Sequence, residues 1–307
     1  MDFIEDFIIR RICLAIKCAN ELGKELKWVQ SGSDGLDDSD ITNLDYEFGP
    51  DRASEFDPLR IRQTTWKNFK EGKVMCRVFF SGLAKIVGFF PEPSIIGPDD
   101  IPLTLWSKIL KAFCHKNWAK SSPRIRIYFV ASVIPREFPA NGRPITPENI
   151  NGGYCYPCKK ELSVYIFRGE DATRVLIHEL FHAFCTDRFE IGLDLVEART
   201  EAWAEIAWCC FLAEGDEKLA KEYFLKQVAW VLGQNMNVAK YIGRRGVETA
   251  EFPWRYTLGK EHIFRRWLLG KLPPPVNTGN SLRLTSPDIV EHVFRDNWQF
   301  EKSKKLI

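Results

Sequence analysis

The sequence predicts an α+β fold, in which a small twisted sheet is flanked by helices. Residues 125–132 (IRIYFVAS) are rich in β-forming side chains and are bounded by Pro123 and Pro135, which is typical of a strand. Two shorter β-like runs follow at 151–156 and 162–168. In most of the remaining chain the apolar residues recur at helical spacing. Together these observations favour a central sheet between helical N-terminal and C-terminal segments.

The composition excludes several classes of protein. Of the 307 residues, 45% are hydrophobic and 13% aromatic, which is too apolar for a disordered chain. The 43 basic and 41 acidic residues give a net charge of +2, so we expect no nucleic-acid partner. No stretch is long and apolar enough to predict a membrane span, and the acidic N-terminus does not resemble a secretory signal. Nine cysteines without even spacing favour a reducing compartment, and we therefore expect a cytoplasmic protein without a membrane partner.

Five segments follow from the pattern along the chain. We expect an N-terminal helix, an acidic loop or linker, a helical N-terminal lobe, a mixed core that carries the chemistry, and a helical C-terminal lobe. Their ranges are 1–30, 31–58, 59–120, 121–215 and 216–307. The acidic segment holds nine acidic residues against Arg52 alone, a net charge of −8. Such a stretch is typical of a solvated connector, and the alternative is a segment that docks on the basic remainder of the chain.

One motif in the mixed core carries chemistry. A strongly apolar helix predicted at 174–185 contains the sequence His178-Glu179-Leu180-Phe181-His182. Residues four apart lie on one face of a helix, so the two imidazoles can bind a single cation. Glu179 then lies beside the metal, where a general base takes a proton from a metal-activated water. Because the surrounding residues are apolar, the two histidines are expected to be buried and to need partners such as a metal ion.

A third metal ligand is expected from the next predicted helix, at 195–212. Glu197, Glu201 and Glu205 recur every four residues there and share one face. With these residues the chain resembles the gluzincins, zinc metallopeptidases of the zincin group that use two histidines and a downstream glutamate as ligands. The resemblance covers about residues 124–212 and implies that His178, His182 and Glu201 bind Zn²⁺. It also implies that Glu205 supports a ligand histidine, and it leaves Glu197 as the alternative third ligand.

The same resemblance implies a substrate site and a zincin-like fold for the core. In gluzincins an edge strand that pairs with the peptide substrate precedes the strand leading into the active-site helix. Here Gly152, Gly153 and Tyr154 fit that edge strand, since glycine lets a peptide backbone approach closely. The family often takes a transition-state donor from the C-terminal region, and Tyr256 is the first choice, with His262 the second.

The predicted function is zinc-dependent hydrolysis of peptide bonds in a peptide or protein substrate. The alternative is a scaffold or interaction protein in which zinc only stabilises the fold. Cys155 and Cys158 form a lone C-x-x-C pair, which we interpret as free thiols because no second pair lies at zinc-finger spacing. The sequence does not specify the substrate, the oligomeric state, or whether cleavage is internal or terminal.

Overall fold

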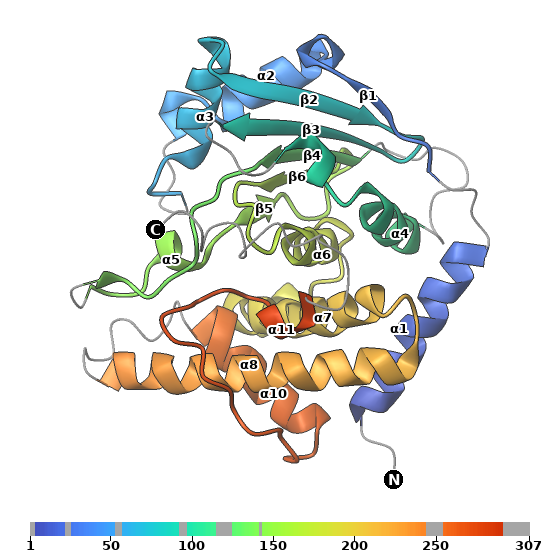
Figure 1. Ribbon diagram of the computed structural model, residues 1–307, viewed down its shortest axis with the longest axis vertical. Coiled ribbons are helices and arrows are strands. Elements are labelled where there is room, and N and C mark those ends of the chain that lie inside the picture. Colours follow the sequence, from blue (N-terminus) through green and yellow to red (C-terminus); the bar gives the residue numbers. More distant parts are fainter. Residues whose placement is uncertain are drawn as a thin grey trace.

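A six-stranded mixed sheet and the helices around it organise the molecule (Figure 1). The computed structural model describes residues 4–21, 26–52, 57–91, 97–114, 125–140, 143–243 and 254–290. The strands are β1 (Val29–Ser31), β2 (Val74–Phe80), β3 (Ala84–Pro91), β4 (Ile125–Val130), β5 (Gly153–Cys155) and β6 (Ser163–Ile166). The longer helices are α1 (Ile4–Glu21), α2 (Asp38–Glu47), α3 (Ile61–Lys70), α4 (Leu103–Cys114), α6 (Ala172–Ala183), α7 (Leu193–Leu212), α8 (Glu217–Gly243) and α10 (Gly259–Trp267). The short ones are α5 (Pro147–Ile150), α11 (Pro287–Val290), the 3₁₀ turns η1 (Ser33–Gly35), η2 (Pro50–Arg52), η3 (Pro98–Asp100) and η5 (Phe189–Ile191), and the π-helical turn η7 (Trp254–Leu258).

The strands lie in the order β1-β2-β3-β4-β6-β5. Strands β3, β4 and β6 are parallel, whereas β1 and β2 at one side and β5 at the other are antiparallel to their neighbours. Helix α4 lies in the connection between the parallel strands β3 and β4, as such a crossover requires. Strand β5 forms one edge of the sheet, and it is the edge that borders the candidate site described below.

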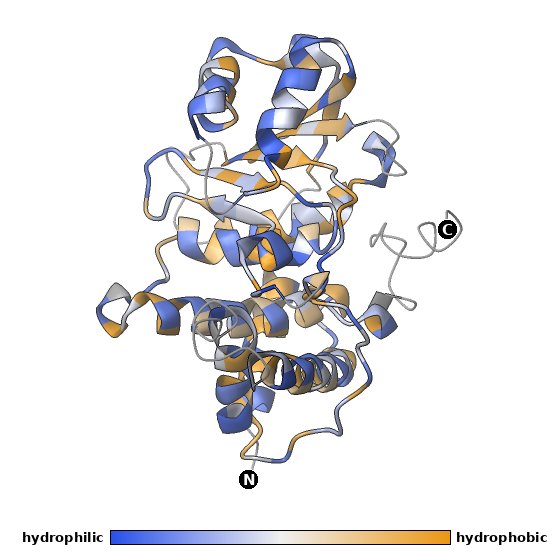
Figure 2. Ribbon diagram, turned by 90° about the vertical axis from the view of Figure 1, so that its left-hand side faces the viewer, coloured by the Kyte–Doolittle hydropathy of each residue, from blue (hydrophilic) through white to orange (hydrophobic). Residues whose placement is uncertain are grey.

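Side chains that alternate along the strands enter two separate cores. On β4, for example, Ile127 and Phe129 face the core shared with α4 and α6, whereas Tyr128 and Val130 face the core shared with α2 and α3. Helices therefore cover both faces of the sheet (Figure 1). Figure 2 shows hydrophilic and hydrophobic residues together on each of these helices, as expected for helices with one buried and one solvated side.

Beneath the sheet, α7 lies between α6 and the C-terminal helices. It packs against α6 on one side and against α1, α8, α10 and η7 on the others (Figure 1). Most of its residues after Val196 are buried, which explains its unusually apolar sequence. The three glutamates on this helix are therefore held at fixed positions between α6 and the C-terminal helices.

The combination of helices and sheet that the sequence predicts is confirmed, but the sheet is larger than expected. The predicted strands at 125–132, 151–156 and 162–168 correspond to β4, β5 and β6. The prediction that 59–120 is helical is wrong for β2 and β3, which form an antiparallel hairpin. Their β-branched and aromatic residues alternate between the two cores, and Ser81 closes the turn by accepting bonds from the amides of Leu83 and Ala84.

The acidic segment is not a connector, so the prediction of a loop or linker at 31–58 is wrong. Its central part is α2, which begins with a capping box between Asp37 and Asp40. Asp40 is fully buried and accepts hydrogen bonds from Lys85, from Arg126 at 2.7 Å and from Tyr128 at 3.0 Å. The acidic charge is thus neutralised by basic residues of the sheet, which docks this segment on the fold.

The predicted helical ends agree with the structure only in part, because Val29 and Gln30 belong to β1 and the described residues 26–28 and 268–286 form no helix. The N-terminal helix is α1, which ends at Glu21, and the C-terminal lobe contains α8 and α10. Parts of both predictions, residues 1–3, 22–25, 244–253 and 291–307, lie outside the described residues. Among the helices that are described, none combines the length and the apolar character needed to cross a bilayer.

Candidate metal centre and cleft

Helix α6 carries the two histidines and is anchored at its first turn. Its N-cap residue, Asp171, is buried and accepts hydrogen bonds from the guanidinium of Arg283 at 3.1 Å and from the amide of Leu284 at 2.8 Å. The charges of Arg283 and Arg136 outweigh the effect of burial and lower the pKa of Asp171, so the carboxylate stays charged. This contact fixes the start of the helix, and α6 packs against β5 and β6 along its length.

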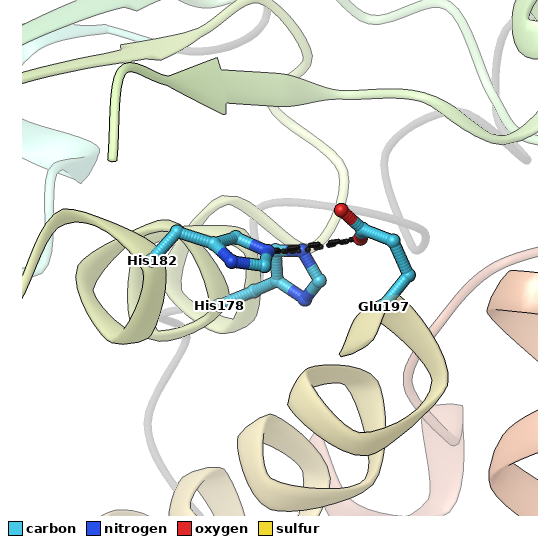
Figure 3. A group of neighbouring side chains, drawn as sticks. All are labelled: His178, His182 and Glu197. Atoms are coloured by element: carbon cyan, nitrogen blue, oxygen red, sulfur yellow. Dashed lines mark hydrogen bonds and ion pairs between the residues drawn. The ribbon is translucent and has the colours of Figure 1, made fainter. Parts of the chain in front are cut away.

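The imidazoles of His178 and His182 face each other one turn apart on α6 (Figure 3). Their Nε2 atoms lie 3.0 Å apart, and both side chains are buried. The carboxylate of Glu197, from the N-terminal part of α7, completes the group. Its Oε2 lies 3.5 Å from Nε2 of His178 and 3.6 Å from Nε2 of His182. The structure thus brings together two nitrogens and one oxygen around a common point.

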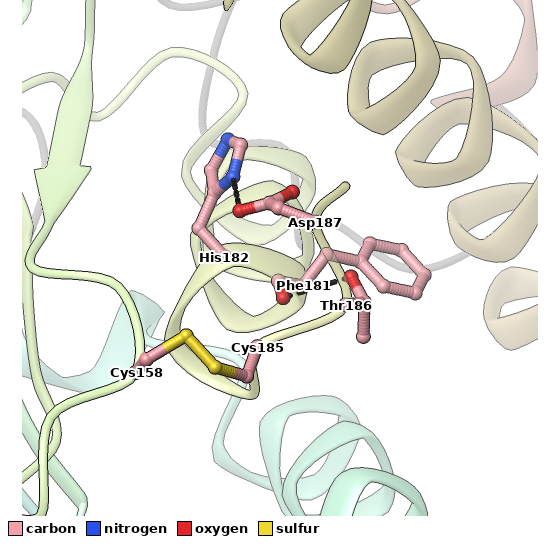
Figure 4. The surroundings of a disulfide bond; sticks show 6 residues. All are labelled: Cys158, Phe181, His182, Cys185, Thr186 and Asp187. Atoms are coloured by element: carbon pink, nitrogen blue, oxygen red, sulfur yellow. Dashed lines mark hydrogen bonds and ion pairs between the residues drawn. A yellow bond between two sulfur atoms is a disulfide. The ribbon is translucent and has the colours of Figure 1, made fainter. Parts of the chain in front are cut away.

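The opposite nitrogen of each imidazole lies close to a carboxylate, and the one of His182 is hydrogen-bonded to it, whereas the one of His178 makes no hydrogen bond among the described residues. Nδ1 of His182 lies 2.7 Å from Oδ2 of Asp187 (Figure 4), and Nδ1 of His178 lies 3.1 Å from Oε1 of Glu201. Carboxylates at these positions favour a proton on Nδ1, which leaves the Nε2 lone pairs directed at each other and at Glu197. Such an arrangement is repulsive unless a cation or a proton lies between the three atoms.

The pKa values of the group reflect this repulsion. Burial alone would lower the pKa of His182, but the hydrogen bond with Asp187 and the contact with Glu197 raise it to about 10. Burial likewise opposes the charged form of Glu197, yet both histidines lower its pKa to about 2. For His178, the charge of Glu201 overcomes burial and raises the pKa. The site therefore attracts positive charge, which protons supply when no metal ion is bound.

The geometry of the three donor atoms fits a zinc ion. A tetrahedral Zn²⁺ with bonds of about 2.0–2.1 Å separates its donor atoms by about 3.3–3.4 Å. The three separations here, 3.0, 3.5 and 3.6 Å, bracket that value. Within the described residues, these three form the one group of histidine, cysteine or acidic side chains whose donor atoms lie close enough to share an ion.

The third member of the group is Glu197, so the structure corrects the expectation that Glu201 is the third ligand. Helix α7 directs both carboxylates toward α6, but Glu201 lies one turn further along and reaches Nδ1 of His178 instead of Nε2. Its carboxylate is also held by Arg174, at 3.0 Å between Nη1 and Oε1, and lies 3.6 Å from Nζ of Lys260. Glu201 thus has the supporting position that was expected of Glu205.

Glu205 lies one layer further from the histidines than predicted. It is fully buried and contacts Nη2 of Arg174 at 3.2 Å and Nζ of Lys260 at 2.6 Å. Those two cations in turn hold Glu201, and the four side chains form a balanced buried cluster of two positive and two negative charges. Because burial of unpaired charge is costly, this cluster fixes Glu201 against His178.

A cleft of about 480 Å³ opens in front of the two histidines. Glu179 lines it together with the metal-site residues, and burial raises the pKa of its carboxyl group. The predicted substrate residues Gly152, Gly153 and Tyr154 line the same cleft from β5 and the residue before it. The structure therefore gathers the expected base and the expected edge strand around one cavity.

The two glycines have a packing reason as well. A Cβ at Gly153 would lie 2.6 Å from Cγ1 of Val175, and a Cβ at Gly152 would lie 2.0 Å from Nη2 of Arg136. Only glycine lets the edge strand approach α6 this closely. The side chain of Tyr154 is engaged elsewhere, since its hydroxyl donates to Glu47 at 2.8 Å and its ring stacks on Tyr165.

The two predicted transition-state donors are separated by the structure. Tyr256, on η7, lines the cleft, and burial together with the nearby carboxylates raises its pKa well above its ordinary value, so its hydroxyl keeps its proton. His262 is exposed and borders a different groove, between α7 and α10. It does not line the cleft, so the structure does not bring His262 to the position expected of a transition-state donor.

The interpretation of Cys155 and Cys158 as two free thiols is wrong for Cys158, which forms a disulfide. Cys158 is bonded to Cys185, which joins the turn between β5 and β6 to the chain just after α6 (Figure 4). Cys155 is free, as predicted, and its thiol donates to the backbone carbonyl of Glu179 at 3.3 Å. The disulfide ties the edge strand to the end of the helix that carries the histidines.

Three supporting residues were not identified from the sequence. Asp187 lies in a loop, and Arg174 and Lys260 are isolated basic residues without a recognisable pattern. The apolar surroundings of Arg174 were the one available signal, because a buried guanidinium needs an acidic partner.

No protein-family model matches the chain, and no curated protein or solved structure matches it significantly. Function must therefore be inferred from the site itself.

Proposed function

We propose that this protein is a zinc-dependent peptidase with a gluzincin-like site. His178, His182 and Glu197 would hold the ion, with Asp187 and Glu201 orienting the imidazoles. Zinc bound there would act as a Lewis acid that activates water and polarises a carbonyl group. The arrangement of one helix with two histidines, a sheet with an edge strand above it, and a second helix with the carboxylates supports a zincin-like core.

Glu179 is the proposed general base. It is adjacent to His178 on α6 and lines the cleft, and its side chain lies against the edge strand, since its Cγ is 3.5 Å from the position of a Cβ at Gly153. Because burial raises its pKa, the carboxylate is a stronger proton acceptor than one in water. Glu179 would accept a proton from the attacking water and pass it to the departing amine.

The substrate would be a peptide or protein that binds in an extended conformation. Strand β5 is at the edge of the sheet and borders the cleft, so a peptide can add to it through main-chain hydrogen bonds. Tyr256, protonated at neutral pH, would donate a hydrogen bond to the oxyanion that forms at the scissile carbonyl.

One observation carries this proposal: both Nε2 atoms and the Glu197 carboxylate converge, while Nδ1 of His182 is hydrogen-bonded to Asp187 and Nδ1 of His178 lies 3.1 Å from Glu201. A histidine pair that only stabilises a core has no need of Nδ1 partners that turn two lone pairs toward each other. Glu179 lies in the cleft beside the proposed ligands, where it can act as a base. A metal ion that only stabilised the fold would not need a base at this position.

The test combines metal content with hydrolysis. The purified protein should bind one zinc ion per chain and cleave members of a mixed peptide library, and a chelator should abolish the cleavage. Glu179→Gln should keep its zinc and its fold but lose at least about 10³-fold in turnover. Zinc binding without any cleavage by the parent protein would instead favour the scaffold alternative.

A further inference from the structure

A second groove adjoins the cleft along the first half of α7, with α10 at one end and the loop that follows α6 at the other. It consists of two hollows of about 790 and 300 Å³, and both are lined by Arg199 and Trp203. We call this surface the side groove. Leu193, the first residue of α7, lines both the larger hollow and the catalytic cleft. A chain that leaves the cleft over Leu193 therefore enters the side groove directly.

The side groove carries unbalanced positive charge. Arg188, Arg199 and Arg266 line it and are exposed, and none of the carboxylates in the described parts of the chain pairs with them. Both of its own carboxylates are already engaged, because Asp187 binds His182 and Asp194 binds Arg255. The groove thus offers three guanidinium groups to a ligand, with His262 beside them.

The floor of the side groove is apolar. The rings of Trp203 and Trp267 pack edge to face, with centroids 5.4 Å apart. Leu193 and Leu195, at the start of α7, also line the larger hollow and are 53% and 40% exposed, which is a large exposure for leucines. Apolar side chains below and guanidinium groups around them suit a polypeptide that combines acidic and apolar residues.

We propose that the side groove binds an acidic segment of the polypeptide substrate, on one side of the bond placed in the cleft. This inference rests on the proposed function and adds a substrate class to it. A peptide fits better than a nucleic acid because the groove continues into a cleft bordered by a sheet edge, and the net charge of the chain is only +2.

The experiment measures binding without cleavage. Two fluorescent peptides, one with three glutamates and the other with glutamines at the same positions, are titrated with the Glu179→Gln protein, and anisotropy is recorded. The acidic peptide should bind about fivefold to tenfold more tightly, because two or three exposed ion pairs contribute modestly each. The double variant Arg199→Gln/Arg266→Gln should lose this preference, and its circular dichroism should match that of the parent.

A neighbouring arginine provides the matched control. Arg265 precedes Arg266 on α10 but binds Glu261 at 2.9 Å and does not line the groove. Arg265→Gln should therefore keep the preference. Equal affinity for both peptides, a preference that survives in the double variant, or equal competition by an oligonucleotide of the same charge would each overturn the inference.

The outcomes also separate this inference from the proposed function. Binding that depends on Arg199 and Arg266, without cleavage of any peptide by the zinc-loaded parent, would support the groove and refute the peptidase. Cleavage without any preference for acidic peptides would support the peptidase and refute the groove.

Discussion

Asp187 and His182 form a short contact in the candidate metal centre, 2.7 Å between Oδ2 and Nδ1. Asp187 lies outside α6, in the loop that leads to η5, and its other oxygen accepts a bond from Thr200 at 3.3 Å. The loop between the two helices of the site therefore takes part in orienting a ligand.

Replacing this carboxylate should weaken metal binding. Asp187→Ala removes the group that fixes the His182 tautomer, so we expect a loss of about 10-fold to 100-fold in zinc affinity. Competition with a chromophoric chelator measures it. Glu190→Ala, at an exposed position in the adjacent η5, is the control and should have no effect. Unchanged affinity of the Asp187 variant would remove that residue from the site.

The two glutamates of α7 should behave differently. Glu197→Gln removes a proposed ligand and should change the visible spectrum of the cobalt-substituted protein, and it should destabilise the metal-free form less than the loss of Glu201 does, because the Glu197 side chain is 18% exposed and that of Glu201 only 2%. Glu201→Gln leaves Arg174 and Lys260 with too little negative charge, and should destabilise the metal-free protein by about 3–5 kcal/mol. Thermal unfolding without metal separates them. A changed cobalt spectrum in the Glu201 variant, together with the larger loss of metal-free stability in the Glu197 variant, would instead identify Glu201 as the ligand.

The docking of the acidic segment predicts a dependence of stability on pH. Burial opposes charge on Asp37, but Lys85, the amide of Asp40 and Arg126 lower its pKa to about 2. A pKa lowered on folding stabilises the protein above the unfolded value near 3.9, and this contribution is lost as the pH falls toward 2. Asp37→Asn keeps a good N-cap residue but loses the charge.

Urea unfolding should therefore show Asp37→Asn to be less stable than the parent at pH 7, with the difference shrinking between pH 4 and pH 2. Asp38→Asn, at the exposed neighbouring position, should match the parent throughout. A constant difference across this range would exclude the proposed charge interaction.

The disulfide should stabilise both the fold and the site. Cys158 and Cys185 are 27 residues apart, and closing a loop of that length contributes roughly 3–4 kcal/mol. The variant Cys158→Ser/Cys185→Ser should melt about 5 °C lower. Cys18→Ser, which changes a free cysteine on α1, is the control. Equal melting temperatures for the double variant and the parent would mean that the bond does not constrain the unfolded chain.

The sequence predicted the elements whose signals are local. Residues 125–132 and the helix around His178 correspond closely to β4 and α6, because hydrophobic periodicity determines both. The hairpin of β2 and β3 was misread as helix in part because β3 is buried on both faces, and a strand buried in this way has no alternation of polar and apolar residues.

The choice between Glu197 and Glu201 could not be made from spacing. They lie 15 and 19 residues after His182, and both point to the same side of α7. Which of them reaches Nε2 depends on how far the loop between α6 and α7 shifts one helix along the other. That shift is a property of tertiary packing, as are the pairing of Cys158 with Cys185 and the contact of Asp187.

The N-cap of α6 has a consequence for the timing of assembly. Asp171 is held by Arg283 and Thr285, which follow it by 112 and 114 residues. A ribosome must therefore translate as far as Arg283 and Thr285 before the first turn of the histidine helix acquires these anchors. A nascent chain that ends before Arg283 lacks both anchors, so the first turn of the histidine helix is fixed only after at least 112 residues beyond Asp171 have been added.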